Sequence, residues 1–373
     1  MEEKVKEQEE ENSLSGLEID EKTLKDLEEK ERQLEELFEM IRLVTPGTPL
    51  REAIDNISKA GLGALIVIGD SNNVINLTNG GFKINCQFSP QKLLELCKMD
   101  GAIILSDKLD KVVYCNTMLV PDPTIDTDET GTRHKAAERT AKQTGRLVIA
   151  ISERRKTITL YYRNIKYTLR SSEELLGKAM ETLRMLEKHR EILNDLITNL
   201  NVLEFTNLAN LADAVLPLQR IEIMKRIVET IKKYVTELGV EGNLVKILLK
   251  EMIKDLDTER NFLIRDYSRN WEFTKTALST LGLDELIEPD NITRALLYSS
   301  SSDNVSPRGY RILSRTSLNE EDLNSIISNF KTLQNILTAK PDELKNIVGE
   351  KNTNKFSKEV SSIREQALLG KKI

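Results

Sequence analysis

Residues 63–69 read GALIVIG, a short apolar run whose length and β-branched side chains predict a buried β-strand. Helical stretches are expected at 50–60, 90–98 and 133–144. Runs of the same strand-like kind follow at residues 102–105, 112–115, 147–151 and 157–162. Because strands mix with helices, the sequence predicts an α/β domain, a mixed central sheet flanked by helices, that extends to about residue 169.

The residues before this domain differ in composition. Residues 1–20 are rich in Glu and Lys and cannot bury enough apolar surface to order themselves, which predicts a disordered acidic leader with no assigned role. Residues 20–41 place apolar side chains three, four or seven apart with charges between them, the pattern of an amphipathic helix. A Thr-Pro-Gly-Thr-Pro turn at 45–49 follows.

The middle of the chain has a helical period. From 171 to 215 apolar residues recur three and four apart, as a helix-packing seam requires: Ala179, Leu183, Leu186, Leu193, Ile197 and Leu200. Further helices are expected around 217–238 and 242–263, with a turn at Gly239 and Gly242. This predicts an all-α middle domain, and the long seam serves either an intramolecular bundle or oligomerisation. A linker at 299–307 (SSSSDNVSP) precedes a small helical C-terminal module.

Length and charge bound the function. A chain of 373 residues predicts two or three domains, and its net charge of −6 gives no overall attraction to nucleic acid. Any DNA contact therefore has to come from a local patch. The sequence has neither a membrane-length apolar stretch nor a signal-peptide core, which predicts a cytoplasmic protein without membrane contact. Cys86, Cys97 and Cys115 fit neither a disulfide framework nor a zinc site, so plain thiols are expected.

Several familiar motifs are missing. The Gly-Lys pair at 177–178 lacks the first glycine and the hydroxyl residue of a phosphate-binding loop, and Gly61-x-Gly63 has no third glycine in register. With only two histidines, a histidine-rich metal motif is excluded. Hydrolytic triads are not expected either, so any nucleotide chemistry has to use a different motif.

Residues 131–138 (GTRHKAAE), at the start of an expected helix, form such a candidate motif. Helix N-termini leave backbone N–H groups unpaired and carry partial positive charge, which suits phosphate. Gly131 permits close backbone approach, Thr132 is expected as the N-cap, and Arg133 and Lys135 can add charge-assisted bonds. His134 can donate to a phosphate or carry a proton. The polar loop at 122–130 lies where a substrate loop would precede the helix.

A second motif, Asp100-Gly101-Ala102, opens the 102–105 strand. Asp-Gly is a common turn, but Asp100 can also hold a metal ion or accept a proton from a ribose hydroxyl, and Gly101 leaves room for a nucleotide. Carboxylates suit Mg²⁺ and Mn²⁺, which neutralise charge in phosphoryl transfer. Ser152, Arg154 and Arg155 follow the 147–151 strand and either reach phosphates or form a charged hairpin turn.

Three stretches in this order, KMDGAIILS, NTMLVPDPTI and ETGTRHKAAERTAKQTG, resemble the diadenylate cyclase domain of bacterial DNA integrity scanning proteins. The three-part layout of the chain is similar to that family over nearly its whole length. The resemblance implies a cyclase domain at 21–170, a helical linker and oligomerisation domain at 171–300, and a helix-hairpin-helix DNA-binding domain at 301–373. It also implies condensation of two ATP into cyclic di-AMP and two pyrophosphates, with Mg²⁺ or Mn²⁺.

The resemblance assigns roles residue by residue. Asp100 assists the attacking 3′-hydroxyl with the metal, and Arg133 and His134 join it as catalytic residues. The implied ATP-binding residues are Gly101, Ala102, Leu119, Thr132, Arg133, His134, Lys135 and Ala136. The family usually has Arg-His-Arg where this chain has Lys135 in third place. Lysine keeps the charge but loses the planar fork, so we expect retained activity with altered phosphate geometry.

The chemistry also bears on assembly, because two ATP sites have to face each other and one chain carries one copy of the motif. The resemblance implies catalysis between subunits of a homo-octamer. It also implies binding of branched DNA by the C-terminal module. The candidate DNA contacts are Arg308, Gly309, Arg311, Gly349, Lys351 and Lys355. At the second hairpin only Gly349 remains of the expected Gly-Ile-Gly, and a solvated charged helix explains the lysines equally well.

Two alternatives stay open. One is a catalytically silent scaffold that binds branched DNA and uses nucleotide as a regulator. The other is a nucleotidyltransferase that moves adenylate onto a different acceptor.

Overall fold

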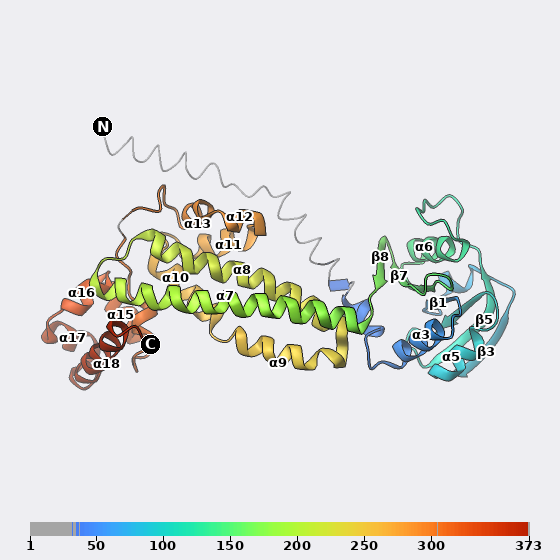
Figure 1. Ribbon diagram of the computed structural model, residues 1–373, viewed down its shortest axis with the longest axis horizontal. Helices are drawn as coiled ribbons and strands as arrows, with labels where there is room; N and C mark the ends of the chain where they lie inside the picture. The colour runs from blue at the N-terminus through green and yellow to red at the C-terminus, as the bar shows by residue number, and fades with distance from the viewer. Residues whose placement is uncertain (1–31, 33–34, 37, 304, 372–373) are drawn as a thin grey trace. The chain divides into compact units, whose positions relative to one another are not determined.

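The computed structural model describes residues 32, 35–36, 38–303 and 305–371 (Figure 1). It divides into two compact units, which are described separately: unit 1 is Met1–Leu176 with Thr236–Gly242, and unit 2 is Gly177–Val235 with Asn243–Ile373. The predicted leader at 1–20 lies outside the described residues, as does most of the amphipathic helix at 20–41, of which residues 38–43 are seen as helix. Among the described helices, none is both long and apolar enough to cross a membrane.

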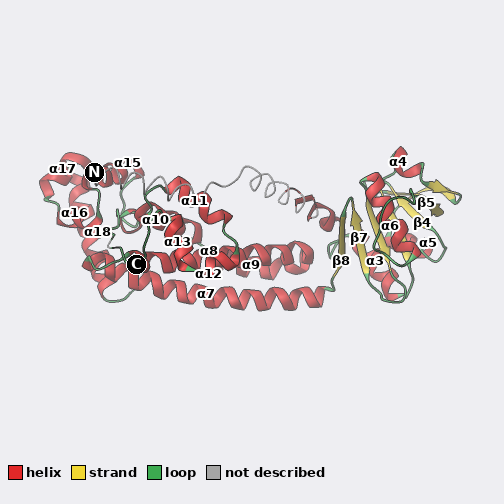
Figure 2. Cartoon of the chain, turned by 90° about the horizontal axis from the view of Figure 1, so that it is seen from above, coloured by secondary structure: helices red, strands yellow, loops and turns green. Residues whose placement is uncertain are grey.

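Unit 1 contains a mixed sheet of order β2-β5-β4-β1-β6-β7-β8, with β3 also paired to β5 (strands in yellow in Figure 2). β1 and β4 are parallel, and the other pairs are antiparallel. The strands are β1 (Ala64–Ile68), β2 (Thr78–Asn79), β3 (Phe82–Gln87), β4 (Ala102–Leu105), β5 (Lys111–Leu119), β6 (Leu147–Ile151), β7 (Ile158–Tyr162) and β8 (Ile165–Leu169). The predicted α/β class with a mixed sheet is confirmed.

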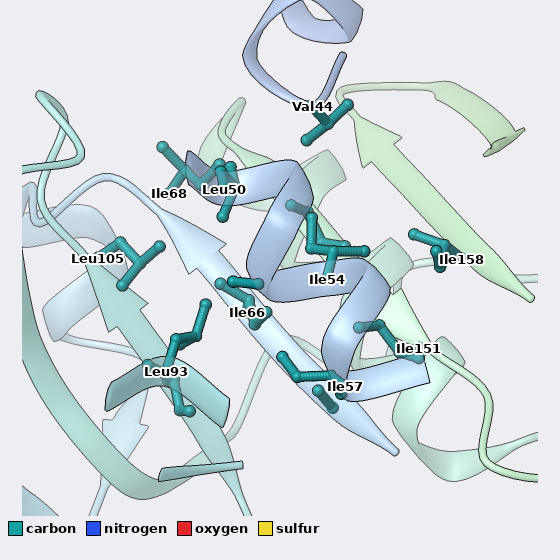
Figure 3. Packing of buried hydrophobic residues seen from close by; sticks show 14 of the residues in the cluster. Val44, Leu50, Ile54, Ile57, Ile66, Ile68, Leu93, Leu105, Ile151 and Ile158 are labelled. Carbon is teal, nitrogen blue, oxygen red and sulfur yellow. The ribbon is translucent and has the colours of Figure 1, made fainter. Parts of the chain in front are cut away.

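The central strand β1 is buried on both faces, and its alternating side chains enter two different cores. Ile66 and Ile68 belong to a core shared with helices α3 (Pro49–Lys59) and α5 (Pro90–Leu96). Figure 3 shows Leu50, Ile54 and Ile57 of α3 packed against this face of the sheet. Leu65 and Val67 point into the second core, which Ala137 and Ala141 of α6 (Thr132–Thr144) complete. Helices therefore cover both faces, as near-continuous apolar strands require.

The sequence did not predict three strands, β2, β3 and β8. Their side chains alternate between partly buried and exposed or are mostly exposed, so they lack the continuous apolar run that marks β1. β3 also has an irregular register against β5, and Asn85 within it has a positive φ of 42°. The short helix α4 (Asn72–Ile75) was not predicted either.

Unit 2 is helical, which confirms the predicted helical middle region, but the helix boundaries differ from the prediction. The chain breaks after Thr206 and not at residue 215, so Pro217 lies inside a helix. The expected helix at 242–263 is two helices. The helices of the middle region, of which residues 172–176 and 236–242 belong to unit 1, are α7 (Ser172–Thr206), α8 (Leu211–Leu238), the 3₁₀ helix η1 (Gly239–Gly242), α9 (Asn243–Met252), α10 (Leu256–Tyr267), α11 (Trp271–Thr280), α12 (Leu283–Ile287) and α13 (Pro289–Ala295).

Polar contacts join these helices. Arg220 of α8 bonds to His189 of α7 at 3.0 Å, and Gln219 of α8 donates to carbonyl oxygens at the end of α12. On α7 the predicted seam is buried at Ala179, Leu186 and Leu200.

The C-terminal module follows the predicted linker and is also helical. Its helices are α14 (Tyr310–Leu313), α15 (Glu320–Phe330), α16 (Leu333–Thr338), α17 (Pro341–Val348) and α18 (Glu350–Leu368). They share one apolar core that includes Ile312, Ile326 and Phe356. Phe205 of α7 enters the same core, so this module packs on the helical middle region within unit 2.

Replacing Ile54 by Ala should destabilise unit 1 by about 2–5 kcal/mol, because the side chain is fully buried between α3 and the sheet. Hydrogen–deuterium exchange of peptides from β1 and β6 in increasing urea would measure this free energy of unfolding. Glu52→Ala, an exposed change on the same helix, is the control and should leave the exchange almost unaltered. Equal exchange in both variants would contradict the role assigned to α3.

Candidate functional site

A cleft of about 910 Å³ opens in unit 1 beside the amino end of α6. Its walls come from the start of β4, the end of β5, the first turn of α6, the β6–β7 turn and β8. The residues expected to bind ATP that line it are Gly101, Ala102, Leu119, Thr132, Arg133, His134 and Ala136. The two sequence motifs at 100–102 and 131–138 therefore meet at one cleft, as the resemblance implies.

The amino end of α6 carries no side-chain cap, because its N-cap is Gly131. This corrects the prediction for Thr132, which is the first helical residue. The first intrahelical bond runs from the N–H of Lys135 to the carbonyl of Gly131 at 2.9 Å. An uncapped helix end that faces a cleft presents N–H groups and partial positive charge to an anion.

Gly101 forms part of the cleft floor and has to be glycine. Its φ is +91°, and a Cβ at this position would lie 2.8 Å from the carbonyl oxygen of Thr117 and 2.9 Å from the carbonyl carbon of Asn116. Both neighbours are backbone atoms of β5, which cannot move aside cheaply. The close approach of the two strands thus leaves a flat floor without a side chain.

Gly63 makes room for the guanidinium of Arg133. A Cβ built on Gly63 would lie 2.0 Å from Nη1 and 2.8 Å from Cζ of Arg133. The positive charge of Arg133 also acts on the thiol of Cys97, which is one of three free thiols in the described residues. Burial raises the pKa of Cys97 to about 12, and the Arg133 charge opposes this only in part. The thiol stays protonated, and Arg133 remains the local charge at this wall.

Glu129, Lys166 and Tyr161 form a polar cluster on the opposite side of the helix end. Lys166 forms an ion pair with Glu129, and the Tyr161 hydroxyl donates to the same carboxylate at 2.6 Å. Burial acts to raise the pKa of Glu129, but the bonds from Lys166 and Tyr161 outweigh it and the pKa is lowered. Glu129 is therefore ionised and is already paired.

His134 lies beside this cluster, with its ring edge-on to Tyr161 at 6.4 Å between centroids. Burial lowers the pKa of His134, and the Glu129 charge opposes this without reversing it. The imidazole is therefore neutral at neutral pH, so it can either donate or accept a proton.

Side chains of α6 hold the polar loop before the helix. The Thr127 hydroxyl donates to Glu138, Arg139 donates to the carbonyl of Ile125 at 2.8 Å, and Lys142 donates to the carbonyl of Asp126 at 2.8 Å. These hydrogen bonds hold the loop against α6 next to the cleft.

Two predicted residues do not line the cleft. Asp100 is exposed and directly precedes Gly101 of the floor, and Lys135 is half-buried in the first turn of α6 without lining the cleft. Within the described residues, no three His, Cys, Asp or Glu side chains gather to hold a metal. An ion on Asp100 would therefore take its other ligands from substrate phosphates and water, as Mg²⁺ commonly does.

The C-terminal candidates divide into two groups. Arg311 is fully buried and pairs with Glu204, and Gly309 is buried with its N–H bonded to Asp266, so neither can reach DNA. Both assignments as DNA contacts are corrected. Arg308 is half-buried at the surface.

In the second group, Gly349 and Lys355 are exposed around the start of α18. The Nζ of Lys355 lies 3.7 Å from Oε1 of Glu359. The side chain of Lys351 lies outside the described part of the chain.

Sequence reasoning missed Glu129, Lys166, Thr159 and Thr168 as residues of the cleft wall. Lys166 and Thr168 lie on β8, the strand that was not predicted, which is why they were overlooked. An alternating Ile-Lys-Tyr-Thr-Leu run at 165–169 was the available signal. Ser152, Arg154 and Arg155 do line the cleft, on the β6–β7 turn.

Gly63→Ala should weaken binding of ATP, the substrate that the resemblance implies, by about 10- to 100-fold, because the new methyl displaces the Arg133 guanidinium and one charge-assisted bond is lost. Isothermal titration calorimetry would measure this. Gly177→Ala, a glycine with open space around its Cβ position, should bind as the unaltered protein does. In a Gly63→Ala, Arg133→Ala double variant, the loss of ATP-binding free energy should be smaller than the sum of the losses in the two single variants. Full additivity would rule out the proposed coupling.

Comparison with known proteins agrees with this geometry. Residues 51–165 match the family described as DisA bacterial checkpoint controller nucleotide-binding, and residues 169–305 match the DisA bacterial checkpoint controller linker region. The DNA integrity scanning protein DisA of Clostridium kluyveri is 41% identical over 346 residues, which cover 90% of this chain and 98% of that protein. The DisA of Acetivibrio thermocellus is 43% identical over 324 residues, 84% of this chain and 90% of that protein.

Among solved structures, a double mutant of DacA from Staphylococcus aureus is 22% identical with a TM-score of 0.29, covering 39% of this chain and 97% of that chain, a likeness too low to support a conclusion. The extended identity with the DisA proteins is the decisive comparison. This chain belongs to the family of the DNA integrity scanning protein DisA, and its α/β domain is the nucleotide-binding, diadenylate cyclase-type domain of that family.

Proposed function

We propose that this protein condenses two ATP into cyclic di-AMP and two pyrophosphates, and that its C-terminal module couples this synthesis to branched DNA. The observation that carries the proposal is the cleft itself. There the uncapped end of α6, the Arg133 guanidinium and the bare floor at Gly101 converge from distant parts of the sequence.

In the proposed reaction the 3′-oxygen of one ATP attacks the α-phosphorus of the other. The new P–O bond forms as the bond to the β-phosphate bridge breaks, pyrophosphate leaves and the hydroxyl proton passes to solvent or a nearby base. A second, identical step closes the ring. Positioning of the two nucleotides and neutralisation of phosphate charge supply most of the acceleration in such transfers.

Different residues at the cleft bind the phosphates, leave space for the sugar and base, and handle the proton. The N–H groups of the first turn of α6 and Arg133 hold phosphate oxygens, while the floor at Gly101 leaves space for the sugar and base. Arg154 and Arg155 on the β6–β7 turn supply further positive charge at the rim. Neutral His134 bonds to a phosphate or takes up a proton, and its lowered pKa keeps the imidazole in the neutral form before the reaction.

Mg²⁺ or Mn²⁺ is the proposed metal, and Asp100 is the side chain that would hold it. The Asp100 carboxylate is exposed beside the cleft floor, and hard oxygen ligands suit either ion. When bound, the metal would neutralise charge on the reacting phosphates.

Two chains have to meet for the ring to form, because each chain contributes one cleft. Phe82, Met118 and Val120, on and beside the strands at the cleft, are 59%, 66% and 52% exposed, and such apolar side chains favour an interface between subunits. Leu244 and Ile247 on α9 are 63% and 64% exposed and favour a further contact between helical regions. The proposed assembly is a homo-octamer, as the family resemblance implies.

For DNA we propose the second hairpin, α17–Gly349–α18. The positive φ of Gly349, +81°, turns the chain into α18 without a side-chain cap, which leaves N–H groups for a phosphate. Lys355 lies near this end. The backbone N–H groups of Gly309, Tyr310 and Arg311 at the start of α14 are excluded from this role because Asp266 already accepts them.

Asp100→Asn should abolish cyclic di-AMP synthesis while ATP binding persists, because the amide cannot hold the metal. Mass spectrometry of the products made from ATP with Mg²⁺ or Mn²⁺ would measure this. Asp107→Asn, an exposed carboxylate that pairs with Arg146 outside the cleft, is the matched control and should remain active. A single adenylated product would favour a transferase with another acceptor, and no product from the unaltered protein with ATP still bound would favour the scaffold.

Saturating four-way junction DNA should slow synthesis by the full-length protein, because DNA held by the C-terminal modules disturbs the pairing of subunits. The measurement is the initial rate of cyclic di-AMP formation with junction DNA and with an equal mass of linear duplex. Unchanged turnover with the junction would refute the coupling and leave the cyclase proposal intact.

A further inference from the structure

A second cleft, of about 360 Å³, lies in unit 2 and is rich in arginine and aromatic side chains. Arg265 lies in the last turn of α10, Arg269 follows the helix, and Trp271 opens α11. Arg308 and Tyr310 come from the chain around the start of α14. It belongs neither to the nucleotide cleft of unit 1 nor to the α17–α18 hairpin.

Arg265 lies between two aromatic rings. Its Cζ is 5.5 Å from the centroid of Trp271 and 5.5 Å from that of Tyr310, and both are cation–π contacts. These contacts order the guanidinium while leaving its charge without a carboxylate partner, since in the described part of the chain no ion pair forms to Arg265.

Arg308 adds a second charge to the same cleft. It donates to the backbone carbonyl of Arg265 and likewise has no carboxylate partner among the described residues. Glu320 is the acidic side chain on the wall. The guanidinium groups of Arg265 and Arg308 therefore give the cleft a positive wall that suits an anionic ligand.

The two walls of the cleft are fixed relative to each other. Asp266, next to Arg265, accepts hydrogen bonds from the N–H groups of Gly309 and Tyr310 at 2.8 and 2.6 Å. The buried Arg311 pairs with Glu204 of α7 directly behind them. The cleft is thus preorganised, and a ligand would spend little binding energy on ordering it.

Trp271 gives the cleft its second chemical property. Its side chain is 43% exposed although Arg265 covers it in part, so ring surface remains for stacking. Trp271 also borders two adjoining hollows of about 220 and 500 Å³, both of which include Lys275. The ring therefore lies in a run of surface depressions and not in a closed pocket.

We propose that this cleft binds an unpaired nucleotide of a nucleic-acid strand, with the base stacked on Trp271 and the phosphates beside Arg265 and Arg308. Stacking on an aromatic ring needs a base whose face is free, which a continuous duplex does not offer. A strand, and not a free nucleotide, fits three hollows that all border the ring. This site goes beyond the proposed function, because it lies apart from the hairpin assigned to DNA.

Trp271 is the chain's single tryptophan, so its fluorescence reports on this cleft alone. Titrating the full-length protein with an oligothymidylate should quench this fluorescence, while anisotropy of a label on the oligonucleotide measures total binding. A duplex of equal length should bind with much less quenching. AMP at the same nucleotide concentration should cause almost none.

Trp271→Ala and Arg265→Ala should each weaken oligothymidylate binding by about tenfold, and Trp271→Phe should retain most of it because the ring persists. Arg184→Ala, which removes an exposed arginine of α7 outside these hollows, is the matched control for charge and should bind normally. All variants should keep the cyclase activity of the unaltered protein, and an unchanged far-UV circular dichroism spectrum and thermal midpoint would show that unit 2 folds in each of them.

Anisotropy that rises without quenching would place the strand elsewhere and overturn the inference, while leaving the hairpin proposal standing. Equal quenching by duplex or by AMP would overturn it as well. Quenching by oligothymidylate in a protein that fails to bind four-way junctions would uphold the cleft and defeat the proposal for branched DNA.

Discussion

Burial of β1 on both faces of the sheet is the constraint on which the N-terminal half of the protein depends. Each face of the strand needs its own helical cover, which α3 and α5 provide on one side and α6 on the other. Gly63 directly precedes β1, and its missing side chain makes room for Arg133 of α6. The packing that buries β1 therefore also holds the amino end of α6, with its unpaired N–H groups, at the rim of the cleft.

A different interaction organises unit 2. Arg311 is wholly buried and pairs with Glu204, while Asn201 accepts a further hydrogen bond from Arg311 and the Tyr267 hydroxyl donates to Glu204. Burial raises the pKa of Glu204, and burial together with the Glu204 charge raises the pKa of Asp266 to about 7. Losing one partner of a buried pair costs roughly 3–5 kcal/mol because the other charge is stranded. This network fixes the C-terminal helices on α7 and α10 in one arrangement.

Much of the fold followed from sequence alone. The continuous apolar runs of β1, β4 and β6 predicted those strands, since full burial leaves a local signature. β3 and β8 were missed because half-exposed edge strands depend on their neighbours for stability. The predicted helix boundary at residue 215 was wrong, because α8 continues through Pro217, a residue that usually stands at helix ends.

The sequence by itself determined the family, the α/β and helical classes, and the residues Gly101, Arg133 and His134 of the candidate site, because short motifs carry such chemistry locally. Only the tertiary structure decided that Glu129 and Lys166 join the cleft, that Lys135 does not line it, and that Arg311 is a buried ion-pair partner and not a DNA contact. The physical reason is that solvent exposure and ion pairing depend on which distant segments meet, and for a charged side chain the linear sequence does not specify that.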